Sequence, residues 1–154
     1  MALHSDTRRR QRFLKIDVVA AHRRIRSHIF HTPLIKNEEL SRLIGGEVWL
    51  KLENGQKTGS FKIRGGLNRV LSLKTSEKRK GIVTASAGNH ALGVAYAAAL
   101  SGIPATIYLP GGASAAKVKK LREYPVQLRQ IGRTYGDAER AAFSHRDRHG
   151  SVFI

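Results

Sequence analysis

The chain has 154 residues, and its 28 Lys plus Arg outnumber its 11 Asp plus Glu, which gives a net charge of +17. This length fits one ordinary domain, and the 41% of apolar residues are enough for a core, so a fibrous or wholly disordered chain is excluded. Cysteine is absent, which excludes disulfides, thiolate metal sites and cysteine nucleophiles and suits a reducing compartment.

The N-terminal segment is basic but does not read as a targeting signal. The arginines at 8–12 resemble a twin-arginine export signal, yet charged residues between 17 and 24 interrupt the apolar stretch that such a signal requires. No apolar run approaches the ~20 residues that span a bilayer. We therefore expect a cytoplasmic protein with no membrane contact and with a frayed basic arm over 1–14.

The positive charge is spread along the chain. Only 8–12 and 78–80 form dense clusters, and neither alternates with the aromatic residues that stack bases in single-strand binders. We expect no specific nucleic-acid binding, but a nonspecific, salt-sensitive attraction to polyanions.

The first half of the chain alternates helices with extended segments. Apolar residues recur at helical spacing near the start, and Thr32-Pro33 ends that helix and begins an extended segment. The expected elements are, in order, a helix over 15–29, a strand over 48–52, a loop over 54–59 and a helix over 61–73 capped by Ser60.

From Gly81 onward, strands and helices alternate regularly. Strands are expected over 82–85, 105–109, 126–131 and 151–154, and helices over 89–101, 114–123 and 136–148. This alternation implies right-handed crossovers and a parallel sheet with helices on both faces. The fold class is therefore α/β, with an open parallel sheet.

Two loops carry the residues from which chemistry is expected. The first runs from Thr58 to Gly66 and places Lys62 in the first turn of a predicted helix. The positive end of the helix dipole, together with any burial, favours the neutral amine of such a lysine, which can form a Schiff base with an aldehyde. The alternative is an ordinary surface lysine on a solvated helix face.

The second loop runs from Thr84 to His90, between an apolar strand and an alanine-rich helix. Its small residues allow backbone N–H groups to converge on one anion, such as a carboxylate or a phosphate. Asn89 adds a neutral side chain that can donate a hydrogen bond to a phenolic oxygen. The alternative is a plain helix N-cap formed by Ser86 or Asn89.

The two loops belong to longer motifs. The chain reads K-L-E-N-G-Q-K-T-G-S-F-K-I-R-G over 51–65 and S-A-G-N-H over 86–90, and His31-Thr32-Pro33-Leu34 precedes both. In this order the motifs resemble the fold type II pyridoxal-phosphate enzymes, and most closely the branch of threonine dehydratases and serine racemases. The resemblance covers roughly residues 16–154 and implies a tryptophan synthase beta-like fold, an amino-acid substrate and a homo-oligomer.

The resemblance also implies a role for individual residues. Lys62 corresponds to the lysine that holds the cofactor, pyridoxal 5'-phosphate, and then moves the substrate α-proton. Phe61 corresponds to a residue beside the cofactor ring, and Asn89 to the residue that bonds the ring hydroxyl. The loop whose backbone corresponds to the one that binds the substrate carboxylate consists of Ser86, Ala87, Gly88, Asn89 and His90. No metal is implied.

Two neighbours of the motifs favour dehydratase or racemase chemistry on a hydroxy amino acid. Threonine synthases of this fold usually place an acid where this chain has Ile63, and cysteine synthases usually carry Thr where it has His90. The implied enzyme is a lyase that converts L-threonine or L-serine into a 2-oxo acid and ammonia, as in isoleucine biosynthesis. The alternative within the family is a serine racemase. The alternative outside it is a catalytically silent α/β remnant whose basic surface binds partners or nucleic acid nonspecifically.

The resemblance further implies a division into domains. Residues 15–52 correspond to the N-terminal portion of the larger domain, 53–150 to the smaller α/β domain, and 151–154 to the start of the return to the larger domain. The family's Gly-rich loop for the cofactor phosphate, and its polar residue facing the pyridine nitrogen, lie farther along and have no counterpart in these residues. We therefore expect an N-terminal part of the fold with an incomplete cofactor site.

His145 and His149 lie one helical turn apart in the last predicted helix. Arg146 and Arg148 flank them, and the glutamate of an HExxH motif does not follow His145. The pair therefore does not predict a metal site.

Overall fold

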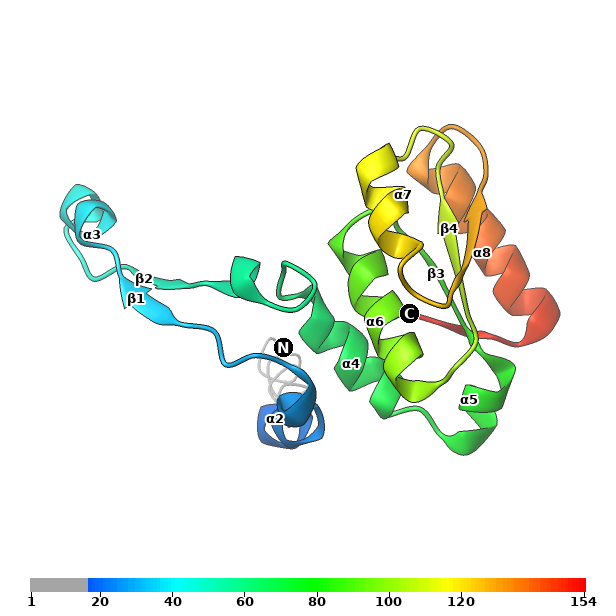
Figure 1. Cartoon of the computed structure of the whole chain (residues 1–154), viewed down its shortest axis with the longest axis horizontal. Helices are drawn as coiled ribbons and strands as arrows, with labels where there is room; N and C mark the ends of the chain where they lie inside the picture. The colour runs from blue at the N-terminus through cyan, green and yellow to red at the C-terminus, as the bar shows by residue number, and fades with distance from the viewer. Residues whose placement is uncertain (1–16) are drawn as a thin grey trace, which may run out of the picture.

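The structure, a computed structural model, describes residues 17–154, so the predicted basic arm over 1–14 lies outside the described residues. Figure 1 shows an α/β body, formed by the later two thirds of the chain, and an N-terminal part that projects from it. The body holds the central sheet and its helices. The N-terminal part consists of one helix followed by a narrow arm of two strands with a short helix between them.

Four parallel strands form the central sheet of the body, in the order β5-β4-β3-β6. They are β3 (Ile82–Ala85), β4 (Ala105–Leu109), β5 (Gln127–Gln130) and β6 (Val152–Phe153). In the register of β3, Ile82 pairs with Ala105 on one side and with Val152 on the other. Every residue of β3 and β4 is buried, as expected for central parallel strands covered on both faces.

Helices cover both faces of this sheet (Figure 1). The helices of the body are α4 (Lys62–Leu71), α5 (Thr75–Lys80), α6 (Asn89–Ser101), α7 (Ala115–Leu121) and α8 (Tyr135–His149). Helices α6 and α7 pack on the face that presents Ile107 and Leu109, and α4 packs against α6. Helix α8 covers the opposite face through Val83 and Tyr108. The α/β fold class predicted from the sequence is confirmed.

Helices α4 and α6 approach each other at two glycines. A Cβ atom on Gly66 would lie 2.6 Å from the carbonyl oxygen of Gly93, and a Cβ atom on Gly93 would lie 2.8 Å from the carbonyl oxygen of Lys62. Real Cβ atoms essentially never come this close to backbone atoms. The spacing of the two helices therefore depends on glycine, and it fixes the start of α4 against the second turn of α6.

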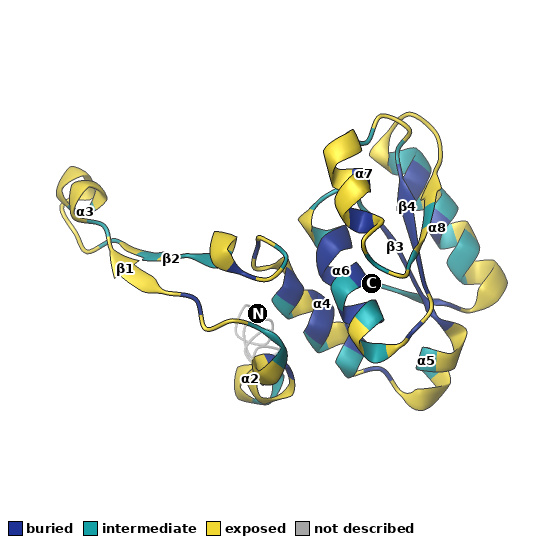
Figure 2. Cartoon of the chain, in the orientation of Figure 1, coloured by how far each residue is buried: buried dark blue, intermediate teal, exposed yellow. Residues whose placement is uncertain are grey.

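The N-terminal part has almost no core of its own. Helix α2 (Val18–Ile25) buries only Ile25 and continues into a 3-10 turn, η1 (Arg26–His28). Strands β1 (Leu34–Lys36) and β2 (Trp49–Lys51) pair antiparallel, and α3 (Glu38–Ile44) between them buries no residue. A second 3-10 turn, η2 (Glu53–Gly55), follows β2. Figure 2 shows that the arm is mostly exposed, and its exposed apolar residues include Leu34, Ile35, Leu43, Ile44 and Trp49.

The predicted element boundaries are most accurate in the body. The strands over 82–85 and 105–109 and the helix over 89–101 are confirmed to the residue. The other predicted elements of the body, α4 included, differ from the observed ones by one or two residues at their ends.

Two local predictions are wrong. The helix expected over 15–29 does not run through as an α-helix, because the chain tightens into η1 after Ile25. Ser60 does not cap α4: Phe61 occupies the N-cap position without a side-chain cap, and Ser60 Oγ accepts only a long hydrogen bond, 3.4 Å, from the N–H of Lys62. Helices α3 and α5 were not predicted at all.

Among the residues described, no helix combines the length and the apolar character needed to cross a membrane. Nor do three or more His, Cys, Asp or Glu side chains of residues 17–154 come together in a group that could hold a metal ion.

Candidate active site

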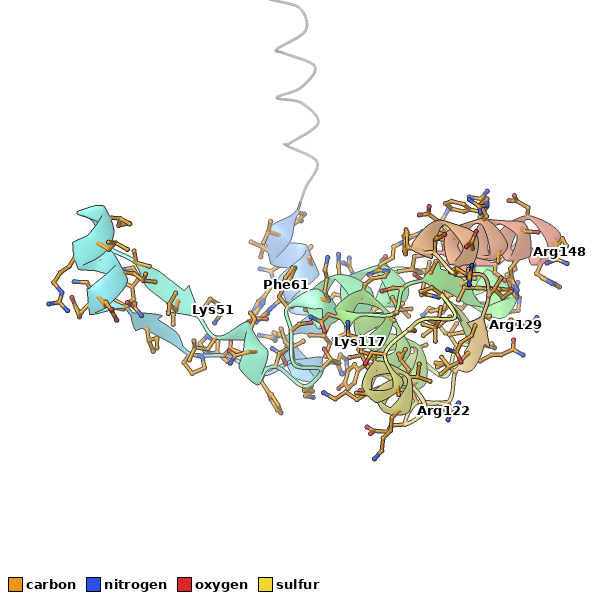
Figure 3. The ribbon with its side chains drawn as sticks, turned by 90° about the horizontal axis from the view of Figure 1, so that it is seen from above. Lys51, Phe61, Lys117, Arg122, Arg129 and Arg148 are labelled. Carbon is orange, nitrogen blue, oxygen red and sulfur yellow. The ribbon has the colours of Figure 1, made fainter. Side chains whose placement is uncertain are left out.

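Lys62 is the first residue of α4 and directly follows Phe61. Both side chains are exposed, Phe61 to 58%, and the Lys62 Nζ lies 5.1 Å from the centroid of the Phe61 ring. Figure 3 shows Phe61 at the junction between the body and the N-terminal part. Lys62 is therefore accessible to an aldehyde, and residues 17–154 do not bury its side chain.

The loop after β3 leads directly into α6. Gly88 occupies the N-cap position and provides no side-chain cap, and Ser86 Oγ accepts a hydrogen bond from the N–H of Gly88 at 3.2 Å. The alternative of an N-cap through Ser86 or Asn89 is therefore wrong. Within the described chain, no hydrogen bond uses the N–H groups of Asn89 and His90, as is usual for a first helical turn. These N–H groups are available to an anion.

The His90 side chain holds the start of α6 to the sheet. Its Nε2 lies 3.1 Å from Thr84 Oγ1 and 3.0 Å from the carbonyl oxygen of Ile154, while Thr84 Oγ1 donates to that same carbonyl at 2.7 Å. Since the hydroxyl proton is used in that bond, both neighbours accept from Nε2, which assigns the ring proton to Nε2. His90 thus contributes its backbone to the loop and its side chain to the packing beneath it.

The two loops meet at one end of the α4 and α6 pair. The carbonyl oxygen of Lys62 lies against Gly93, which is one helical turn beyond Asn89. The residues from Ser86 to Gly88 follow the carboxyl end of β3, where ligands gather in open α/β sheets. Lys62 and the 86–90 loop therefore lie at neighbouring helix N-termini, beside the carboxyl edge of the sheet (Figure 1).

An ion pair that the sequence does not reveal anchors this region. Arg64 Nε donates to Glu53 Oε2 at 2.8 Å, and Arg64 Nη2 donates to Glu53 Oε1 at 2.7 Å. The buried Thr32 adds a hydrogen bond from Oγ1 to Glu53 Oε1 at 2.6 Å. The hydrogen bond from Arg64, more than any other contact, lowers the pKa of Glu53 to about 2. The ion pair ties α4 to η2, and the Thr32 hydrogen bond extends this link to the segment that precedes β1.

Gln56 provides a second anchor. Its side chain, only 4% exposed, accepts from the N–H of Phe30 and donates to the carbonyl oxygen of Phe30, both at 2.9 Å. Glu53, Gln56 and Arg64 all belong to the 51–65 motif, but their partners Thr32 and Phe30 lie 21 and 26 residues from Glu53 and Gln56. A sequence pattern that reveals spacing within one motif cannot reveal such distant partners.

The Glu53 pair predicts an acid-sensitive contribution to stability. Because the folded-state pKa of about 2 lies below the ordinary value of 4.5, the pair stabilises the fold fully above pH 4.5, and this contribution is lost as the pH falls toward 2. We expect a loss on the order of 2 kcal/mol, allowing for the solvent that reaches the pair. Urea unfolding at pH 6 and at pH 2.5 measures this loss. The free energy of unfolding of Glu53→Gln should change less between the two pH values than that of the unaltered chain. Equal differences in both proteins would contradict this role.

A comparison with models of protein families matches residues 25–154 to the family described as pyridoxal-phosphate dependent enzyme. The match covers most of the chain, so the chain belongs to this family. The α/β sheet and the order of the two motif loops agree with this assignment, as the resemblance implied.

Three relatives show which members of the family this chain is similar to. The L-threonine ammonia-lyase of Thermotoga maritima is 44% identical over 138 residues, which are 90% of this chain and 34% of that protein. The catabolic L-threonine dehydratase TdcB of Escherichia coli strain K12 is 38% identical over 138 residues, 90% of this chain and 42% of that protein. The solved structure of maize serine racemase matches with a TM-score of 0.81 and 34% identity, covering 88% of this chain and 41% of that one. The chain spans less than half the length of each of these relatives.

Proposed function

We propose that this chain contributes the lysine-bearing part of a pyridoxal-phosphate-dependent ammonia-lyase that acts on L-threonine or L-serine. The observation that best supports this proposal is that Lys62 and the 86–90 loop lie at neighbouring helix N-termini, beside the carboxyl edge of the sheet. The names of the relatives from Thermotoga maritima and Escherichia coli support threonine as a substrate. The structural match to maize serine racemase supports serine.

The residues present fit the reactive side of the cofactor. Lys62 offers an accessible primary amine, and the exposed ring of Phe61 beside it presents a flat apolar surface. Asn89, exposed at the first position of α6, can donate to a ring hydroxyl. When bound, the cofactor supplies an electron-withdrawing ring that stabilises negative charge on the substrate α-carbon.

The residues of this chain would supply proton transfer and substrate binding. Lys62 would hold the cofactor through Nζ, and as a free amine its Nζ would accept the substrate α-proton. The free N–H groups of Asn89 and His90, at the positive end of α6, bind and orient the substrate carboxylate. The hydrogen bonds of His90 to Thr84 and Ile154 hold that first turn in place.

We also propose the domain division, the homo-oligomeric assembly, the cytoplasmic location and the role in isoleucine biosynthesis that the resemblance implies. The division at residue 53 is supported by the contrast between the mostly exposed segment before it and the buried core after it. In that division the arm of β1, α3 and β2 belongs to the larger domain, and its exposed apolar residues are the surface which that domain would cover.

Turnover of L-threonine tests the proposed activity. We expect the chain to form 2-oxobutanoate with added pyridoxal phosphate, far more slowly than the rate of about 10 per second typical of enzymes. Lys62→Ala should abolish this turnover, and Lys119→Ala, which removes an exposed lysine on α7, should leave it unchanged. L-Serine tested in parallel distinguishes the two substrates. A rate in Lys62→Ala equal to that of the unaltered chain would contradict the proposal.

A further inference from the structure

A cavity lies at the opposite edge of the sheet from Lys62. It has a volume of about 270 Å³ and is bordered by the amino ends of β3, β4 and β5 and by α8. Its polar lining residues are Lys80, Thr106, Gln127, His145 and Ser151. No aspartate or glutamate lines it. A cavity of this size and composition suits a small polar ligand rather than an apolar one.

Several hydrogen-bond donors around the cavity are not used by hydrogen bonds within residues 17–154 and are available to a ligand. Thr106 Oγ1 donates to Gln127 Oε1 at 3.3 Å, which leaves the Gln127 amide NH₂ free to donate. Tyr108 Oη lies 3.2 Å from His145 Nδ1, and when the hydroxyl donates there, the ring proton lies on Nε2. The Lys80 ammonium lies over Gly150, at the end of α8, and has no ion-pair partner among residues 17–154.

Further basic side chains surround His145. Arg129 on β5, together with His149 and Arg148 on α8, lies close enough to act on its charge, and these neighbours add to burial in lowering the pKa of His145. Arg129 and Arg148 are exposed and have no carboxylate partner within the described residues. Figure 3 shows that both lie on the same side of the body. Within residues 17–154, no carboxylate forms an ion pair with Lys80, Arg129 or Arg148.

We propose that this cavity binds a phosphate dianion, either inorganic phosphate or the phosphate group of a small phosphomonoester. Lys80, the Gln127 amide and His145 supply donors from three different elements, and Arg129 and Arg148 supply the attracting charge. The ligand neutralises positive charge that has no ion-pair partner within residues 17–154. The site is separate from the Lys62 site, because it lies at the amino edge of the sheet.

Titration with inorganic phosphate, in the absence of pyridoxal phosphate, tests this site independently of the proposed activity. We expect saturable binding by calorimetry, and a rise of about half a unit or more in the pKa of His145, followed by NMR of its ring protons. Lys80→Gln should weaken phosphate binding by about tenfold, because it removes a charge-assisted hydrogen bond. Glycerol 3-phosphate titrated in parallel separates the sources: tighter binding than phosphate indicates a phosphomonoester, and weaker binding indicates the free ion.

The matched control is Lys119→Gln, which removes the same charge from an exposed position on α7 that does not line the cavity. It should leave phosphate affinity and the His145 titration unchanged. The proposal is overturned if Lys119→Gln weakens binding as much as Lys80→Gln, since diffuse attraction by the net charge would then be sufficient. It is also overturned if His145 does not respond to phosphate, or if a short single-stranded oligonucleotide binds more tightly than either phosphate compound and is equally sensitive to both variants.

Discussion

Replacing Gly93 by alanine is expected to lower the free energy of unfolding by about 1 kcal/mol. The new Cβ atom would lie 2.8 Å from the carbonyl oxygen of Lys62 and 3.0 Å from the backbone nitrogen of Ile63, so α4 and α6 would have to move apart. Overpacking of this kind costs about 1–3 kcal/mol, and the better helix propensity of alanine recovers only ~1 kcal/mol. Because the contact involves the backbone of Lys62, the variant should also bind pyridoxal phosphate more weakly.

Gly65→Ala is the matched control for this prediction. Gly65 also lies within a helix, but a Cβ atom there would have no neighbour within 4 Å. Alanine at this position should therefore stabilise the fold by roughly 0.5–1 kcal/mol. Urea unfolding followed by circular dichroism measures both variants. Changes of the same sign and size would show that the distance between α4 and α6 does not depend on Gly93.

Lys62→Ala is expected to remove the visible absorbance band that the chain develops with pyridoxal phosphate. That band requires a covalent link to an amine, and Lys62 is the lysine that the motif and the fold place at the α4 N-terminus beside the 86–90 loop. Lys62→Arg should lose the band as well, because an arginine preserves the charge but not the reactive amine. Retention of the band in Lys62→Arg would show that another amine carries the cofactor.

The body of the fold could be predicted from sequence because its elements have strong local signals. Strands β3 and β4 are short apolar runs, and both ends of α6 are marked by glycines, Gly88 and Gly102. Because these elements are largely buried, their apolar sequences and the glycines at the ends of α6 show where they begin and end. The parallel arrangement then follows from the alternation of strands and helices.

The elements that were not predicted lack that signal. Helix α5 consists entirely of polar residues, Thr75–Lys80, and is held by the Glu77 side chain accepting from the N–H of Lys74 rather than by an apolar face. Helix α3 has only seven residues and buries none of them, although Asn37 caps it. Periodicity cannot identify helices as short and as exposed as these.

The sequence could likewise predict only part of the candidate site. Lys62, Asn89 and the 86–90 loop belong to contiguous motifs, so a resemblance could find them. The contacts that position them join residues far apart in the chain: His90 to Ile154 across 64 positions, and Thr32 to Glu53 across 21. Only the folded chain reveals that Gly93 supports Lys62, or that Thr32 and Arg64 share the carboxylate of Glu53.

Borohydride reduction of the chain with bound pyridoxal phosphate, followed by mass spectrometry of its peptides, locates the lysine that holds the cofactor. We expect a single modified peptide that carries the label on Lys62, with exposed lysines elsewhere unlabelled at equimolar cofactor. A label distributed over Lys117, Lys119 and Lys120 on α7, without enrichment at Lys62, would contradict the assignment of the site.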